Sequence, residues 1–286
     1  MISKATQVIR SKSDTPQTIG NLMKTLIASA KRKIKFILPR FAIEFLVQLK
    51  HLGKDKPKKY QVYLNYVANK NGIEIGGPST LFKTRLPLYQ IISSLDGVNF
   101  SDTTIWEGEI QPGLNYNFIG NRKGNQFISD ATDLSQIKDC TYDFILSSNC
   151  LEHIANPIKA LIEWKRVIKY NGSLILILPN KTSNFDHNRS VSSFEHILKD
   201  FNNNITEQDL THLEEILKLH DLSMDPPAGN FENFKNRSLK NFKFRALHHH
   251  VFDLNLMQSM LEYLGFVIIE KDETKTDFFI LAIKNI

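Results

Sequence analysis

Two adjacent glycines in the stretch 71–82 (NGIEIGGPSTLF) are the first residues whose types suggest chemistry. Residues 72–75 form a short, mostly apolar run that is typical of a buried parallel strand. Gly76 and Gly77 allow a sharp turn and let the backbone approach a ligand closely, because no Cβ stands in the way. A hydroxyl residue at 79–80 is suited to cap a following helix, whose free N–H groups would face the turn. The stretch predicts a strand–turn–helix unit that either binds a nucleotide-like group or is only a tight turn.

Two acidic residues further along the chain have positions that suit the binding of a nucleoside. Asp96 lies 22 residues after Glu74, the distance at which nucleotide-binding α/β folds place an acidic group for the ribose hydroxyls. Asn99 is a second candidate for the same role. Asp130 comes directly after a short apolar run and is suited to accept a hydrogen bond from an exocyclic amine. Both aspartates also fit an alternative role in local turns or helix caps.

Histidines supply the candidates for proton transfer. A histidine with an unperturbed pKa of about 6.5 is suited to act as a general base near neutral pH. We take His187, His249 and His250 as the first candidates and His153 as the next. Three adjacent histidines at 248–250 cannot all face the same way on an extended chain, because alternate residues share a face. A metal site would need further ligands in suitable places, so we assign no metal.

The segments that must position these residues alternate between apolar runs and helical patterns. Strands are predicted at 72–75, 95–100, 126–128, 142–148, 173–178, 265–270 and 277–284, and helices at 81–93, 157–168, 206–220 and 254–264. Alternation of this kind predicts a parallel sheet with helices on both faces. In such a sheet a ligand binds in the crevice beyond the carboxyl ends of the strands.

The run YDFILSSNCLEHIANPIKALIEWKRVIKYNGSLILILPN, residues 142–180, gives the clearest sign of a family. It resembles the second half of class I S-adenosylmethionine-dependent methyltransferases, and more narrowly the group known as methyltransferase type 11. The resemblance implies a Rossmann-like three-layer α/β sandwich. Its mostly parallel seven-stranded sheet would have the order 3-2-1-4-5-7-6 and an antiparallel last strand.

The resemblance also implies an enzyme that transfers a methyl group from S-adenosylmethionine by in-line displacement. The residues that it places against this cofactor are Glu74, Gly76, Gly77, Asp96, Asp130, Ala131, Ser148 and Asn149. The glycine motif departs from the family pattern, since Pro78 stands where a glycine is usual. The dinucleotide fingerprint G-x-G-x-x-G is not met, which disfavours an oxidoreductase.

The segment 181–247 is far longer than a connecting loop and begins with a polar cluster, FDHNR, directly after a predicted strand. We expect an insert that builds the acceptor pocket, although a packed helical cap without substrate contact is an alternative. The polar residues favour a small-molecule or glycan acceptor, methylated at a hydroxyl. The alternative function is a non-catalytic protein that binds S-adenosylmethionine or a nucleotide and interacts through its basic arm.

That arm is residues 1–59, expected to be partly disordered and then helical, and the methyltransferase domain is expected at 60–286. Residues 1–60 contain 14 Lys or Arg against 3 Asp or Glu, so the arm accounts for the overall charge of +6. The arm fits either helices packed on the main domain or a surface in contact with an anionic membrane. The acidic remainder of the chain disfavours nucleic acid. The sequence does not indicate an oligomeric state.

Two cysteines, an N-terminus without signal-peptide features and the lack of a long apolar run are typical of a cytoplasmic protein.

Overall fold

The computed structural model describes residues 56–285, which belong to a compact unit that begins at Gly53. The predictions for the basic arm, including its membrane contact, lie outside the described residues. Between residues 56 and 285 the structure has no helix with the length and apolar character needed to cross a membrane.

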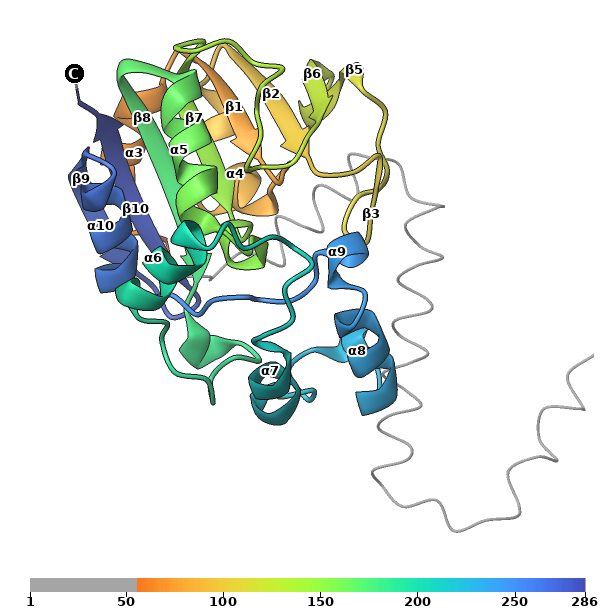
Figure 1. The fold of residues 1–286 in the computed structure, drawn as a ribbon. Helices are drawn as coiled ribbons and strands as arrows, with labels where there is room; N and C mark the ends of the chain where they lie inside the picture. The colour runs from red at the N-terminus through yellow and green to blue at the C-terminus, as the bar shows by residue number, and fades with distance from the viewer. Residues whose placement is uncertain (1–55, 286) are drawn as a thin grey trace, which may run out of the picture. The chain divides into compact units, whose positions relative to one another are not determined.

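The centre of the fold is an eight-stranded sheet with the order β5-β6-β2-β1-β7-β8-β10-β9 (Figure 1). The pairs β6–β2, β2–β1, β1–β7 and β7–β8 are parallel, and β10 runs antiparallel to both of its neighbours. The strands are β1 (Asn71–Ile75), β2 (Ser94–Asn99), β5 (Gly113–Ile119), β6 (Arg122–Ile128), β7 (Tyr142–Ser148), β8 (Ile168–Pro179), β9 (Phe266–Glu273) and β10 (Asp277–Lys284). The predicted order of seven strands is confirmed, and β5 adds an eighth strand at the edge.

Helices cover both faces of the sheet because its central strands are apolar on both sides. One apolar cluster joins the sheet to α5 (Pro157–Val167), α6 (Phe194–Asn202) and α10 (Leu254–Tyr263). A second cluster on the other face joins it to α3 (Tyr60–Val67), α4 (Thr80–Thr84) and the 3₁₀ turn η1 (Leu88–Gln90). The three layers of the predicted sandwich are thus present.

Two predicted helices differ from those observed. The helix predicted at 81–93 is split into α4 and η1, because Pro87 lies between them. The helix predicted at 206–220 begins only at Leu213, as α7 (Leu213–Leu219), and residues 206–212 form turns. Helix α6 was not predicted.

Residues 206–247, which we call the cap, lie beyond the carboxyl ends of the parallel strands (Figure 1). The cap contains α7, α8 (Phe231–Ser238), α9 (Asn241–Phe244) and the 3₁₀ turn η4 (Pro226–Ala228). It has a small apolar cluster of its own, formed by Ile216, Ala228, Phe234 and Leu247.

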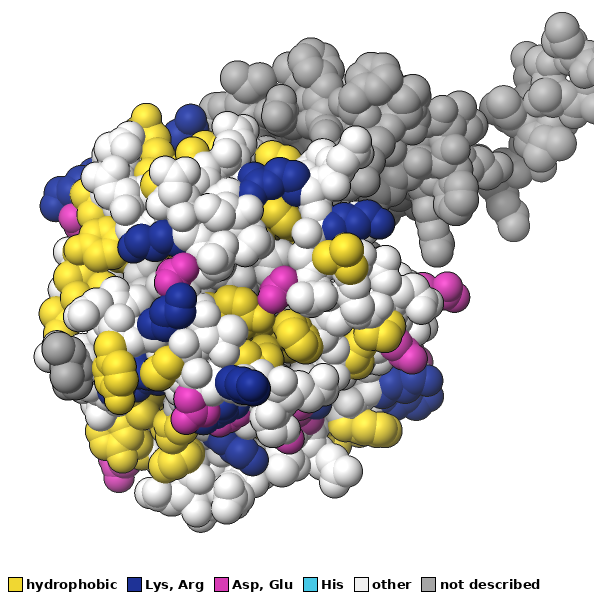
Figure 2. All heavy atoms as spheres, turned by 90° about the horizontal axis from the view of Figure 1, so that it is seen from above, with side chains coloured by type: hydrophobic (Ala, Val, Ile, Leu, Met, Phe, Trp, Pro, Cys, Tyr) yellow, Lys and Arg dark blue, Asp and Glu magenta, His cyan; other side chains and the backbone are white. Residues whose placement is uncertain are grey.

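On the face seen from above in Figure 2, basic and acidic side chains are interspersed and no histidine is visible.

A small antiparallel pair, β3 (Thr103–Thr104) and β4 (Gly108–Glu109), forms a hairpin in the connection between β2 and β5. It belongs to the stretch 103–122, for which the sequence indicated no role.

Candidate active site

A cleft of about 820 Å³ opens at the carboxyl ends of β1, β2, β6, β7 and β8. This is the edge at which an open α/β sheet binds its ligand. The cap closes one side of the cleft, and Pro227, Arg237, Arg245 and Ala246 contribute to its lining. The size of the cleft falls within the range of cofactor and small-molecule sites.

The glycine turn after β1 forms part of the cleft wall. Gly76 lines the cleft with a φ of +81°, and a Cβ added there would lie 2.6 Å from the sulfur of Cys150. A Cβ added to Gly77 would overlap both the carboxylate of Glu74 and the hydroxyl of Tyr116. Both positions therefore require glycine, and the turn lets a ligand approach the backbone at Gly76.

Glu74 lies beneath this turn and does not line the cleft. Its buried carboxylate accepts hydrogen bonds from the hydroxyls of Tyr89 and Tyr116 and from the backbone N–H of Ser79. Burial raises the pKa of Glu74 to about 7, although these hydrogen bonds act in the opposite direction. This position does not support the expected direct contact with the cofactor, because Glu74 fixes the turn from below.

Asp96 also lies outside the cleft lining, so its position does not support the expected role on the ribose. The residue faces Ile73 in the register of β1 and β2, well before the carboxyl end of the strand. Its carboxylate accepts hydrogen bonds from the Tyr142 hydroxyl and the Asn125 N–H. The second candidate, Asn99, ends β2, lines the cleft and donates a hydrogen bond to the carbonyl oxygen of Gly77.

Asp130 closes a turn and is not part of the cleft lining. One of its oxygens accepts hydrogen bonds from Thr132 and the other pairs with Arg245 at 2.7 Å. Burial raises the pKa of Asp130, but the hydrogen bonds and the charge of Arg245 outweigh it, so the pKa is lowered. The adjacent Ala131 does line the cleft, so the turn still forms part of the wall where a flat ring would lie.

The last expected cofactor residues, Ser148 and Asn149, lie in the cleft at the end of β7. The chain thus brings Gly76, Asn99, Ala131 and Asn149 to one wall, and β1, β2, β6 and β7 each end beside one of them. Gly76 presents bare backbone to the cleft, with Cys150 packed where its Cβ would lie, and the amide of Asn99 is a polar group at the end of β2. These residues fit S-adenosylmethionine.

The four histidines predicted as bases do not share one place. His187 is partly exposed and pairs with Asp221, whereas His249 and His250 are buried and pair with Glu207 and Asp200. None of these three histidines lines the cleft. Their assignment as bases is therefore not supported by their positions, and only His153 lies in the cleft as expected.

Two residues that were not predicted stand beside His153. The ligand atoms of Glu152, His153 and His248 all lie within 4.8 Å of one another, and all three residues line the cleft. Glu152 is 1% exposed, and among residues 56–285 neither of its carboxylate oxygens has a hydrogen-bond partner. The sequence carried a signal for Glu152, which belongs to the run that resembles the family, but the alternation at 248–250 did not identify His248, because His250 does not line the cleft.

The protonation of the group follows from its surroundings. Burial raises the pKa of Glu152 to about 7. Burial lowers the pKa of His248, but the carboxylate of Asp186, 2.5 Å from Nδ1, more than offsets this, so the pKa is raised. Burial opposes ionisation of Asp186 as well, yet the charges of His248 and Arg189 lower its pKa to about 2.

His153 differs from His248 in its charge. Burial holds the pKa of His153 well below its usual range, and the neighbouring His248 lowers it further. The ring is therefore neutral at physiological pH. Its Nδ1 lies 3.0 Å from the carbonyl oxygen of Leu247, which can only accept, so Nδ1 carries the proton and Nε2 is unprotonated.

Comparisons with known proteins find a matching family model and a relative that shares a short stretch of sequence. Residues 103–176 match the family model of the methyltransferase domain. A stretch of 46 residues is 48% identical to an uncharacterized protein of Methanocaldococcus jannaschii. That match covers 16% of this chain and spans about a fifth of the relative's length (20%).

Solved structures of similar shape have low identity. A SAM-dependent methyltransferase from Aquifex aeolicus is 16% identical, with a TM-score of 0.45, over 86% of this chain and 98% of that one. An S-adenosylmethionine-dependent methyltransferase from Mesorhizobium loti is 10% identical, with a TM-score of 0.46, over 78% of this chain and 95% of that one. Over residues 103–176 this chain is therefore similar to methyltransferase domains, and its strand order is the one that the resemblance of residues 142–180 implied.

Proposed function

We propose that the protein methylates a hydroxyl group of a small polar acceptor, such as a sugar or glycan, with Glu152 as the general base. The observation that carries this proposal is the buried, unpartnered carboxylate of Glu152 in the wall of the cleft. An unpaired buried carboxylate is costly, so its retention favours a role toward a bound group. An acceptor hydroxyl would supply the missing hydrogen bond.

Bound S-adenosylmethionine supplies a methyl group that is electrophilic enough for direct displacement. The residues of this chain then have two tasks, which are to hold the acceptor in line and to remove its proton. Gly76, Asn99, Ala131 and Asn149 would hold the cofactor along the sheet edge. The cap would hold the acceptor above it.

Glu152 is better suited to remove the proton than either histidine beside it. A base is most effective when its pKa lies near the working pH, and that of Glu152 is raised to about 7. The carboxylate of Asp186 raises the pKa of His248 and so favours its charged form, which suits it to stabilise a negative Glu152 rather than to accept a proton. The low pKa of His153 makes Nε2 a hydrogen-bond acceptor but a weak base.

The lining of the cleft on the cap side favours a polyhydroxylated acceptor. Arg237, Asp225 and Asn184 provide hydrogen-bonding groups there, and Phe185 and Trp106 provide aromatic faces. Sugars combine hydroxyl groups with an apolar ring face, so they suit a wall of this kind. The choice of a sugar or glycan among polar acceptors rests on this chemistry alone.

The cofactor site is tested by calorimetry with S-adenosylmethionine and S-adenosylhomocysteine, with NAD as the control ligand. We expect binding to the wild-type chain and loss of binding by about 100-fold in Gly76→Ala, because the added Cβ meets Cys150 at a positive φ. Gly120→Ala is the matched control, since Gly120 also has a positive φ (+53°) but open space around its Cβ. Equal binding by both variants would contradict the cofactor site.

The role of Glu152 is tested by methyl transfer from radiolabelled S-adenosylmethionine to a panel of sugars and glycans. We expect Glu152→Gln to lower the turnover number by about 10²- to 10⁴-fold while cofactor binding is kept. Full turnover in Glu152→Gln would exclude it as the base. Loss of cofactor binding in the same variant would assign it a structural role instead.

A further inference from the structure

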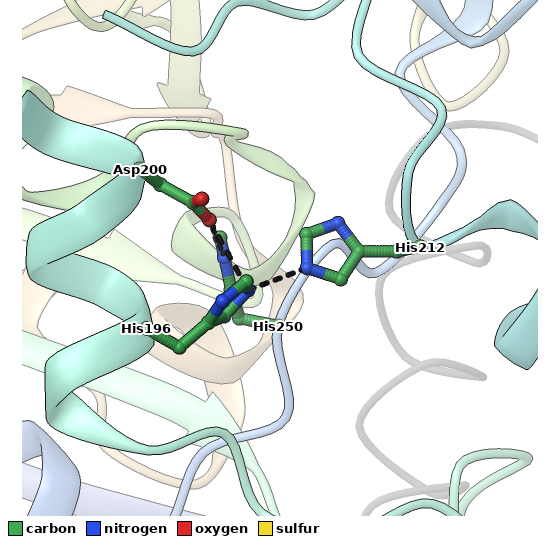
Figure 3. A group of neighbouring side chains, drawn as sticks. All are labelled: His196, Asp200, His212 and His250. Carbon is green, nitrogen blue, oxygen red and sulfur yellow. Dashed lines mark hydrogen bonds and ion pairs between the residues drawn. The ribbon is translucent and has the colours of Figure 1, made fainter. Parts of the chain in front are cut away.

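A second group of histidines lies apart from the cleft lining, where α6 meets the cap. His196 and Asp200 are one turn apart on α6, His212 directly precedes α7, and His250 lies in the segment before α10. Figure 3 shows the side chains of all four residues pointing toward one another. Their ligand atoms all lie within 4.8 Å of one another.

The distances inside this group, which we call the histidine cluster, fit a shared ion. The Nε2 atoms of His196 and His212 are 2.7 Å apart. The same carboxylate oxygen of Asp200, Oδ2, lies 2.9 Å from Nε2 of His250 and 3.3 Å from Nε2 of His196. In a tetrahedral zinc site with bonds of about 2.0–2.1 Å, neighbouring ligand atoms are about 3.3 Å apart. Three of the six separations among the four atoms are at or somewhat below this spacing, and all six are within 4.8 Å, so the side chains need to move by only an ångström or so.

The protein surroundings explain neither the convergence nor the burial of these groups. Two Nε2 atoms at 2.7 Å can share only one proton between them, and three imidazole rings meet one carboxylate. The side chain of His250 is fully buried and that of Asp200 is 9% exposed, whereas that of His196 is 37% exposed. The cluster is therefore closed on the side of the protein core and reachable from solvent at His196.

From this geometry we propose that the histidine cluster binds a divalent transition metal ion, with zinc as the best match, through Nε2 of His196, His212 and His250 and the carboxylate of Asp200. Imidazole nitrogens with one carboxylate are a ligand set that suits zinc. Four protein ligands leave no open position, which is the pattern of a structural rather than a catalytic site.

The ion would fasten the cap to the main domain. Helix α6 packs on the core through Ile197, whereas His212 is the N-cap residue of α7, the first helix of the cap. His250 lies two residues after His248, which lines the cleft. One ion would thus connect the core, the cap and the segment that carries His248, and it takes no part in the proposed methyl transfer.

The test uses the full chain without a polyhistidine tag. We expect the purified protein to contain one zinc ion per chain by mass spectrometry of the metal content. After removal of metal with a chelator, calorimetric titration with Zn²⁺ should show one site, and Zn²⁺ should raise the melting temperature. Co²⁺ in place of Zn²⁺ should give the intense visible absorption of a tetrahedral site.

Variants identify the ligands. His196→Ala is the preferred change because this side chain is the most exposed of the four, and we expect it to weaken Zn²⁺ binding about 100-fold. Asp200→Asn removes the charge and keeps the shape, and it should weaken binding as well. His187→Ala is the control, since His187 is partly exposed and lies outside the cluster.

Three results would overturn the proposal. The first is a wild-type chain that neither retains zinc nor responds to added Zn²⁺ in the calorimeter or in its melting temperature. The second is His196→Ala binding Zn²⁺ as tightly as wild type. The third is a loss of Zn²⁺ binding in His187→Ala that equals the loss in His196→Ala.

Discussion

The sheet core and the cap of this protein are held together by different forces. The core joins all its central strands to helices on both faces through two large apolar clusters. The cap has only four buried apolar side chains in its own cluster. Its contacts with the rest of the chain include an ion pair of Arg245 with Asp130 at 2.7 Å, and Arg245 also pairs with Glu207 inside the cap at 2.9 Å.

This difference indicates how the two regions respond to change. Burial of apolar side chains stabilises the core by about 25 cal/mol for each Å² of apolar surface removed from water. The cap depends instead on a few ion pairs and hydrogen bonds. Loss of one partner from such a contact lowers stability, because the other partner stays buried without compensation. We therefore expect the cap to open locally, at a lower free energy than that of global unfolding.

The largest effect is expected in the core. Trp164 is fully buried against the sheet, and its indole N–H donates a hydrogen bond to the carbonyl oxygen of Ala131 at 3.0 Å. Trp164→Ala should lower the free energy of unfolding by about 3–5 kcal/mol. Chemical denaturation measures this change. Ile162→Ala, on the exposed side of the same helix, should change it by less than about 0.5 kcal/mol.

A charged contact beside the cap gives the next effect. Arg189 is 2% exposed and donates hydrogen bonds to Asp186 and to the carbonyl oxygens of His248 and His249. Arg189→Met leaves these acceptors without a donor, at an expected cost of about 3 kcal/mol. Hydrogen exchange should become faster in residues 206–247 and stay unchanged in β7 and β8. Equally faster exchange in both regions would mean that the cap does not open independently.

The buried carboxylate under the glycine turn makes stability depend on pH. Glu74 binds its proton more tightly when folded, because its pKa rises from 4.5 to about 7. Between these values the folded state holds more protons than the unfolded state, so stability falls as the pH rises. The contribution amounts to about 3 kcal/mol, is complete below pH 4.5 and is lost through pH 7.

Denaturation at several pH values, on wild type and Glu74→Gln, measures this contribution. The difference in unfolding free energy between the two proteins should change with pH in this window, since glutamine does not titrate. A constant difference across the window would show that Glu74 has an ordinary pKa.

The smallest effects come from two matched helix caps. Asp253 is the N-cap residue of α10, which packs on the core, and Asn230 is the N-cap residue of α8, which belongs to residues 206–247. In each case a side-chain oxygen accepts a hydrogen bond from a backbone N–H. Replacing either residue with alanine should cost about 1 kcal/mol. We expect Asp253→Ala to lower the melting temperature of the whole domain, whereas Asn230→Ala should speed exchange only within residues 206–247.

Much of the core could be predicted from the sequence because strand patterns and strand order depend on local apolar runs. Strands β7 and β10 were predicted at their observed bounds, whereas β8 begins at Ile168, five residues before its predicted start. Strand β5 was missed because its exposed half contains Asn and Gly, which are rare in strands. The start of α7 was misplaced because Thr206 resembles a helix cap, although it begins a turn.

The site was harder to predict because sequence distance does not fix depth in a strand. Asp96 has the expected spacing from Glu74, yet β2 continues to Asn99. The carboxyl end of the strand, where the cleft opens, therefore lies three residues beyond Asp96. The depressed pKa of Asp186, the charge on His248 and the unpaired state of Glu152 arise from contacts between residues far apart in the chain. A sequence alone does not contain those distances.

Tyr116 reaches Glu74 from β5, the strand that was added to the predicted sheet. Its ring occupies the space above Gly97, and its hydroxyl occupies the space beside Gly77, where an added Cβ would overlap it in each case. The two glycines and the tyrosine therefore form one packing unit. In relatives that lack an aromatic residue at position 116, we expect residues other than glycine to be tolerated at position 97. The edge strand and the glycine turn would then change together across the family.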